Sequence, residues 1–187
     1  MNWQGLCKKL IKIFPMQNFK QISVIIVNFR SRHYLERCLA SIYQKMENQN
    51  FEIIVVNNDK QEKLLDIREK YPEVKIFNQD VNIGYGKGVN LGAKEASGEI
   101  LLILNPDTEL LSNLDSVIRV FFQNREIGAL SPKLIDKSGK TQEWVAGKEI
   151  SLSSILLNKL GLNKNQKIWE NPKQKEVDWV SGAAFFI

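Results

Sequence analysis

Four short strand-like runs, each followed within a few residues by asparagine or aspartate, constrain the fold of this 187-residue chain more than any other feature. The first two runs are rich in isoleucine and valine and lack apolar–polar alternation, which predicts strands buried on both faces. The four runs cover residues 22–27, 52–56, 74–77 and 99–104.

Helical patterns separate these runs. Ser31 is a candidate N-cap for a helix that reaches about residue 46, and its expected apolar face comprises Tyr34, Leu35, Cys38, Leu39, Ile42, Tyr43 and Met46. Further helices are expected over residues 61–70, from the glycine-rich turn at 82–88 to about residue 96, and over 114–122, with a fifth strand at 127–131. Strands that alternate with helices predict an α/β fold: a mostly parallel sheet with helices on both faces.

The rest of the chain is less regular. Residues 136–176 are polar apart from an apolar helical stretch at 152–160, which is typical of a long active-site insertion. Strand-like patterns return at 177–180 and 183–187. Residues 1–20 form a leader with two open interpretations: an amphipathic helix on an anionic membrane surface, or a poorly ordered start before Met16. The predicted domain therefore covers residues 21–187.

The net charge of +5 favours negatively charged partners, which include nucleotide diphosphates and membrane surfaces. Nucleic acid is not expected as a partner, because the basic residues are scattered and form no nucleic-acid-binding motif. Two cysteines, Cys7 and Cys38, make a disulfide framework implausible, and Cys38 fits the buried face of its helix. We expect a cytoplasmic protein, with contact to the inner face of the membrane as the open alternative.

Polar residues follow all four runs, at the sheet edge where open parallel sheets bind ligands. They are Asn28, residues 57–59, residues 82–86 and residues 105–107. Asp107 follows an apolar strand and Pro106, which places a carboxylate where it can hold Mg²⁺ or Mn²⁺. Such a cation would neutralise charge on a nucleoside-diphosphate leaving group.

Glycines 84, 86 and 88 follow the third run rather than the first, so they do not form a dinucleotide fingerprint. We interpret them as a place where the backbone approaches a ligand closely, with Lys87 available to a phosphate. A plain tight turn is the alternative for each glycine.

Together these segments resemble the inverting family-2 glycosyltransferases of the GT-A fold, particularly their rhamnosyltransferase-like branch. The matching pieces occur in family order at residues 24–29, 53–58, 82–92, 98–107 and 179–184.

The resemblance implies roles for individual residues. Asn28 and Phe29 match the nucleobase contact, and Asn57 takes a position that usually holds an aspartate paired with the base. Asn58 agrees with the family pattern, and Asn105 and Asp107 match a variant of its metal-binding motif. The other implied residues are Gly84, Lys87 and Asn90 on the nucleotide-sugar side and Trp179, Gly182 and Ala183 on the acceptor side.

The implied reaction transfers a sugar from a dTDP- or UDP-linked donor to a glycan or lipid-linked acceptor. The family's catalytic base is expected beyond Ile187, so we expect a partial domain whose last strand is an unpaired, aggregation-prone edge. A binding module without turnover is the alternative. A sugar-phosphate nucleotidyltransferase is disfavoured, because residues 28–31 lack the glycine-rich basic loop that such enzymes place after the first strand.

Overall fold

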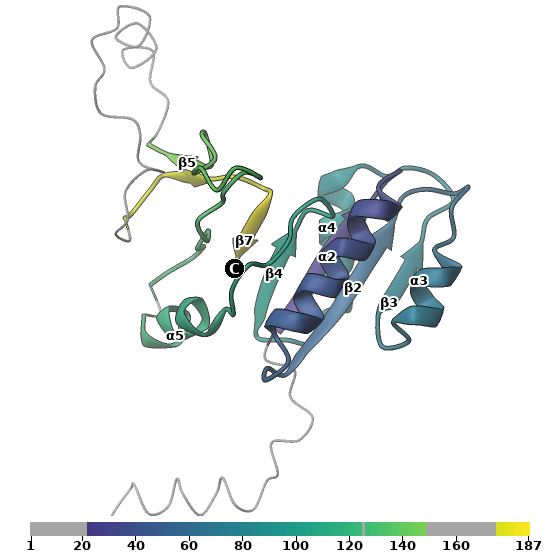
Figure 1. Cartoon of the computed structure of the whole chain (residues 1–187), viewed down its shortest axis with the longest axis horizontal. Coiled ribbons are helices and arrows are strands. Elements are labelled where there is room, and N and C mark those ends of the chain that lie inside the picture. The colour runs from purple at the N-terminus through teal and green to yellow at the C-terminus, as the bar shows by residue number, and fades with distance from the viewer. Residues whose placement is uncertain (1–21, 125, 149–174) are drawn as a thin grey trace, which may run out of the picture.

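The described chain is built around one five-stranded sheet of order β3-β2-β1-β4-β7. The computed structural model describes residues 22–124, 126–148 and 175–187 (Figure 1). The strands are β1 (Ile22–Asn28), β2 (Phe51–Asn57), β3 (Lys75–Asn78), β4 (Ile100–Leu104) and β7 (Ala184–Phe186), with β5 (Ala146–Gly147) and β6 (Trp179–Val180) in a separate pair. The helices are α2 (Arg32–Lys45), α3 (Leu65–Lys70), α4 (Tyr85–Glu95) and α5 (Asp115–Gln123).

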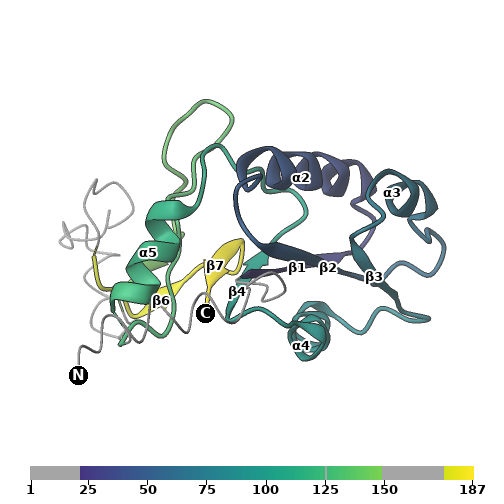
Figure 2. The same ribbon diagram turned by 90° about the horizontal axis from the view of Figure 1, so that it is seen from below.

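Strands β1 to β4 run parallel, and only β7 runs antiparallel, against β4. Helices α2 and α3 cover one face of the sheet and α4 covers the other (Figure 2). The predicted mostly parallel α/β architecture is therefore confirmed. All seven residues of β1 are buried, as a strand covered on both faces requires.

Helix α4 lies very close to β1 because two of its residues are glycines. A Cβ added at Gly88 would meet Val27 at 2.9 Å, and one added at Gly92 would meet Ile25 at 2.5 Å. Gly88 thus serves helix packing, and its predicted close approach to a ligand stays a prediction.

Two predicted strand features are corrected. Residues 127–131 form no strand; Leu130 alone makes an antiparallel bridge to Phe186. The fifth strand is β7, which pairs with β4 on one side and exchanges two backbone hydrogen bonds with Leu130 on the other, at 3.0 and 2.8 Å. Because Phe186 has no exposed surface, the expectation of an unpaired final strand is also wrong.

Smaller differences concern helix starts. Ser31 precedes α2, but its hydroxyl makes no capping hydrogen bond. Helix α3 begins only at Leu65, after Leu64 adopts a left-handed conformation (φ 53°). The expectations for residues 1–20 and 152–160 lie outside the described residues. No helix in the described ranges has the length and apolar character needed to cross a membrane.

A buried carboxylate ties the amino ends of the strands together. Glu52 Oε1 accepts hydrogen bonds from the Ser23 hydroxyl (2.6 Å), the Ser97 backbone amide (2.6 Å) and the Ser97 hydroxyl (2.7 Å), and Lys75 Nζ lies 2.8 Å from Oε2. Burial by itself would raise the pKa of the Glu52 carboxyl. The hydrogen bonds from Lys75, Ser23 and Ser97 outweigh it and lower that pKa to about 2.

This network predicts a specific acid sensitivity. A lowered folded-state pKa stabilises the fold above the unfolded-state pKa of about 4.3, and this stability is lost as pH falls towards 2. Glu52→Gln should therefore lower the free energy of unfolding at pH 7 and flatten its pH dependence between about pH 4.5 and 2. Urea unfolding at several pH values measures both effects; a variant with the pH dependence of the parent would contradict the assignment.

The glycine packing predicts opposite outcomes at two positions of α4. Gly92→Ala introduces a methyl group that overlaps Ile25 and should destabilise the fold by about 1–3 kcal/mol. Gly86→Ala is the matched control, because its Cβ meets nothing within 4 Å and alanine favours a helix by up to about 1 kcal/mol. Thermal unfolding of both variants tests the pair; equal midpoints would show that α4 has room to move off β1.

Candidate functional site

An open cleft of about 510 Å³ lies at the carboxyl ends of the parallel strands. Its lining comes from β1 and α2 with the loop between them, from the segment after β2, from the start of α4 and from the segment after β4. The lining residues are Val27, Phe29, Ser31, Tyr34, Asn58, Asn82, Gly84, Tyr85, Asn105, Pro106 and Asp107. Polar residues predicted at three of the strand ends thus meet at one cleft, and the first strand end contributes Phe29 and Ser31 in place of Asn28.

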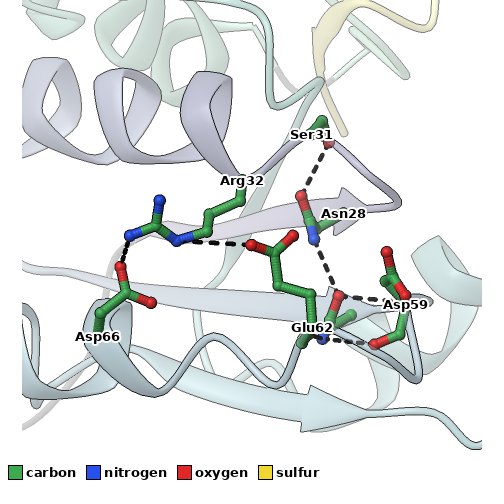
Figure 3. A network of polar contacts seen from close by, with 7 residues as sticks. Asn28, Ser31, Arg32, Asp59, Glu62 and Asp66 are labelled. Atoms are coloured by element: carbon green, nitrogen blue, oxygen red, sulfur yellow. Dashed lines mark hydrogen bonds and ion pairs between the residues drawn. The ribbon is translucent and has the colours of Figure 1, made fainter.

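Beneath the cleft, side-chain amides form a continuous chain across three strands. Asn28 and Asn57 are register partners, as are Asn57 and Asn78. The Ser31 hydroxyl donates to Asn28 Oδ1 (2.8 Å), and Asn28 Nδ2 donates to Asn57 Oδ1 (2.9 Å; Figure 3). Asn57 Nδ2 donates in turn to Asn78 Oδ1 (2.9 Å). Parallel pairing in this register brings the three amides side by side.

Asn57 is the centre of this chain. Its Nδ2 also donates to the backbone oxygens of Glu62 (2.6 Å) and Asp59 (3.2 Å), which holds the loop after β2 in place. Asn28 and Asn57 have no exposed surface and do not line the cleft. Their amides bond to the protein itself, and the nucleobase contact implied for them stays a prediction.

Exposed ion pairs also connect the start of α2 to the loop after β2 and to the start of α3. Arg32 forms ion pairs with Glu62, at 3.6 Å, and with Asp66 (Figure 3). These side chains are more than one third exposed, so each pair contributes at most about 1 kcal/mol. They orient the loop more than they stabilise the fold.

Asn58 differs from its neighbour because it faces the cleft. Its backbone amide donates to Asn28 O (2.8 Å), and its Nδ2 donates to Gly84 O (3.3 Å). The residue is only 2% exposed, yet no donor within the described part of the chain reaches its Oδ1. A buried acceptor without a partner costs about 1–3 kcal/mol, so an N–H group that reached this oxygen would relieve that cost.

Gly84 is held on the cleft wall in a conformation that suits glycine, with φ at 84°. Its amide donates to Asn82 Oδ1 (2.9 Å), which closes a tight turn before α4. Lys87 and Asn90 lie on α4 with exposed side chains and do not line the cleft. Their predicted contact with a nucleotide sugar therefore remains a prediction.

Asp107 is the one carboxylate among the residues that line the cleft. Two residues on, Glu109 forms an ion pair with Arg37, whereas no ion pair or hydrogen bond of the Asp107 side chain occurs within the described ranges. The described residues also contain no group of three acidic, histidine or cysteine side chains placed to hold a metal. A cation bound here would therefore take most of its ligands from phosphate and water.

Cys38 lies behind the Asp107 segment. It is fully buried, as predicted, and its thiol donates to Asn105 O at 3.9 Å. Burial raises the pKa of this thiol to about 12. It is a packing residue that supports the strand end rather than a nucleophile.

Three aromatic side chains line the cleft, and one of them, Tyr34, was not predicted there from the sequence. Phe29, Tyr34 and Tyr85 are 42%, 48% and 43% exposed. Arg30, in a left-handed conformation (φ 55°), places its guanidinium 5.1 Å from the Phe29 ring centre. Tyr34 was assigned to the buried face of its helix, and that assignment is wrong. Its ring lies at the first turn of α2, where the helix passes the cleft.

The residues predicted on the acceptor side lie in β6 and in the turn that leads from β6 to β7. Trp179 packs over Gly147, and its indole donates to Lys148 O at 3.0 Å. Gly182 and Ala183 follow in the turn between β6 and β7, beside Tyr85 and Asn105. None of the three lines the cleft, and their contact with an acceptor remains a prediction.

Comparisons with known proteins agree with this arrangement. Residues 23–178 match the model of the family described as glycosyl transferase family 2. A dolichol-phosphate mannosyltransferase of Pyrococcus furiosus is 28% identical over 79% of this chain and 43% of its own length. The O-antigen biosynthesis protein RfbC of Myxococcus xanthus is 33% identical over 69% of this chain and 10% of its own length. The chain thus spans less than half of these relatives.

Solved structures share the fold. A crystal structure of S. aureus TarS 1-349 aligns with a TM-score of 0.54 at 23% identity and covers 73% of this chain and 44% of its own. The mannosyltransferase PcManGT from Pyrobaculum calidifontis, in complex with GDP-Man and Mn²⁺, aligns with a TM-score of 0.50 at 18% identity. The alignment covers 67% of this chain and 41% of that structure's chain. The sheet and its covering helices are thus those of GT-A glycosyltransferases.

The amide chain predicts that aspartate is not tolerated at position 57. Asn57→Asp keeps the acceptor for Asn28 but removes the donor to Glu62 O and Asn78 Oδ1, and leaves a buried carboxylate facing them. We expect a loss of about 1–3 kcal/mol or more in stability at pH 7, with partial recovery at pH 4 where the carboxyl protonates. Asn78→Asp, which keeps its acceptor oxygen at an exposed position, is the control for added charge. Urea unfolding that finds both variants equally stable would contradict the proposed role of Asn57.

Proposed function

The chain belongs to glycosyl transferase family 2, and on this basis we propose that its cleft binds the nucleoside diphosphate of a sugar donor. The observation that carries the proposal is that two side-chain groups without a partner in the described part of the chain belong to residues of one cleft. One is the buried acceptor of Asn58, and the other is the Asp107 carboxylate. The first suits an N–H group and the second suits a cation that bridges phosphates.

Asn58 Oδ1 is the proposed contact of the nucleobase. Uracil and thymine carry a ring N–H beside two carbonyl oxygens, and a single buried acceptor matches that N–H. The aromatic rings of Phe29 and Tyr34 line the same cleft and offer apolar surface to a planar base. This supports dTDP or UDP as the carrier without distinguishing between them.

Asp107 is the proposed protein ligand of Mg²⁺ or Mn²⁺. Magnesium is commonly held by one or two carboxylates together with substrate phosphates and water, so a single carboxylate fits this mode. When bound, the cation would neutralise the negative charge that develops on the leaving nucleoside diphosphate. The Mn²⁺ of the PcManGT complex supports this choice of cofactor.

The proposed reaction is transfer of the sugar, with inversion, to a glycan or lipid-linked acceptor. Relatives named for lipid-linked products support the acceptor class: the dolichol-phosphate mannosyltransferase and a GalNAc(5)-diNAcBac-PP-undecaprenol β-1,3-glucosyltransferase of Campylobacter jejuni. The rhamnosyltransferase-like branch, the donor sugar and cytoplasmic action at the membrane face stay predictions.

A second candidate is binding without turnover by this chain alone. Asp107 is the only carboxylate lining the cleft in the described ranges. If it holds the cation, no acidic side chain of that lining is left to deprotonate the acceptor hydroxyl. A coupled assay for release of nucleoside diphosphate distinguishes the candidates, because turnover by the 187-residue chain would rule out the second.

Nucleotide binding is the prediction that tests the proposal. Calorimetry with UDP and dTDP should show tighter binding with Mn²⁺ than without it. Asp107→Asn should lower the affinity in Mn²⁺ by roughly tenfold or more, the size expected from losing about 1.5–3 kcal/mol of a charged contact. Affinity without metal should change little.

Glu109→Gln is the matched control, since this carboxylate lies two residues away and is paired with Arg37 outside the cleft. It should bind as the parent does. Two outcomes would contradict the assignment of Asp107 as a metal ligand. One is that the Asp107 and Glu109 variants give the same isotherm, and the other is that nucleotide binding does not respond to Mn²⁺.

A further inference from the structure

One side chain of the cleft reaches a segment 97 residues away. The Tyr85 hydroxyl donates a hydrogen bond of 2.8 Å to Gly182 O, in the turn between β6 and β7. Tyr85 opens α4, and its residue lines the cleft together with Asp107 and Asn58. A single residue therefore touches both the cleft and the turn.

The next carbonyl of the turn is also held from the cleft. Ala183 O accepts a hydrogen bond from the Asn105 backbone amide (2.8 Å) and a longer one from the Thr108 hydroxyl (3.5 Å). Asn105 lines the cleft beside Asp107. Two successive carbonyls of one turn are thus bonded to two cleft residues from different elements, α4 and the end of β4.

The two bonds differ in how they can respond to a ligand. The bond from Asn105 is between backbones and extends the β4–β7 pairing. The bond from Tyr85 depends on one half-exposed ring, 43% accessible, whose position a ligand in the cleft can bias. Burial raises the pKa of the Tyr85 hydroxyl, so the group keeps its proton and remains a donor at neutral pH.

We propose that Tyr85 is a positioning residue that couples occupancy of the cleft to the order of the turn at residues 181–183. A nucleotide that fixes the Tyr85 ring strengthens its bond to Gly182 O and so orders the turn next to Asp107. The inference rests on the proposed function, since it gives donor binding a structural consequence on the predicted acceptor side. Coupling of this kind is reciprocal, so an ordered turn also favours the bound nucleotide.

Hydrogen exchange of the full chain tests the inference, with the Tyr85→Phe variant keeping the ring and removing only the hydroxyl. Without ligand, the amides of residues 181–184 should exchange about threefold to tenfold faster than in the parent, the factor expected from one lost hydrogen bond. Addition of UDP with Mg²⁺ should slow these amides in the parent and leave them unchanged in Tyr85→Phe. The slowing of exchange on addition of UDP with Mg²⁺ is the decisive readout, because a purely structural role of Tyr85 would leave this slowing unchanged in the variant.

Tyr34→Phe is the matched control. Tyr34 lines the same cleft with a similar exposure of 48%, and no hydrogen bond of its hydroxyl is found in the described part of the chain. The control should show parent-like exchange at residues 181–184 in the absence of ligand, and it serves the ligand-free comparison alone. Amides of β1 and β2 report the integrity of the fold in the same measurement.

The outcomes separate the claims. Parent-like exchange of the turn in ligand-free Tyr85→Phe would overturn the positioning role, as would a rise spread equally over β1 and β2. Faster turn exchange that UDP still slows would leave Tyr85 structural and overturn the coupling. If calorimetry finds no nucleotide binding to the parent, the proposed function fails and the coupling with it, while the ligand-free comparison still decides whether Tyr85 holds the turn.

Discussion

The hydrogen bond between Asn28 and Asn57 is the interaction on which the cleft depends. It exists because β1 and β2 pair in parallel with these residues in register, so both strands end at the same level. From it, contacts spread to Ser31 on one loop and to Glu62 on the other. Each loop also contains a non-glycine residue with positive φ, Arg30 at 55° and Leu64 at 53°. Such conformations persist where surrounding contacts over-determine them, and the amide chain supplies those contacts here.

This arrangement gives two adjacent asparagines different surroundings. Asn57 points into the protein and has all its groups bonded, whereas Asn58 lines the cleft with an acceptor to spare. The difference follows from strand geometry, because successive side chains of an extended segment point in opposite directions. An amide suits position 57, because both N–H groups of its side chain donate to other groups of the protein. An asparagine at this position is therefore consistent with a structural role.

Much of this could be predicted from the sequence, for physical reasons. Buried parallel strands have a strong local pattern, and β1, β2, β3 and β4 lie within one or two residues of their predicted bounds. Strand ends gather by topology, which placed Asp107 and Gly84 at the cleft. The strand pattern at 183–187 is likewise confirmed as β7. What was missed depends on tertiary contacts: residues 127–131 form no strand, β7 is the fifth strand of the sheet, and Gly88 is small because Val27 lies against it. Tyr34 has an apolar ring in a helical pattern, and only the position of the cleft distinguishes it from a core residue.

The most direct measurement follows the side-chain amide groups of Asn28, Asn57 and Asn58 by nuclear magnetic resonance while UDP and Mg²⁺ are added. If Asn58 contacts the nucleobase and the other two belong to the framework, the Asn58 amide resonances should shift clearly with nucleotide and those of Asn28 and Asn57 should barely move. Large shifts of Asn28 and Asn57 with a stationary Asn58 would contradict the account.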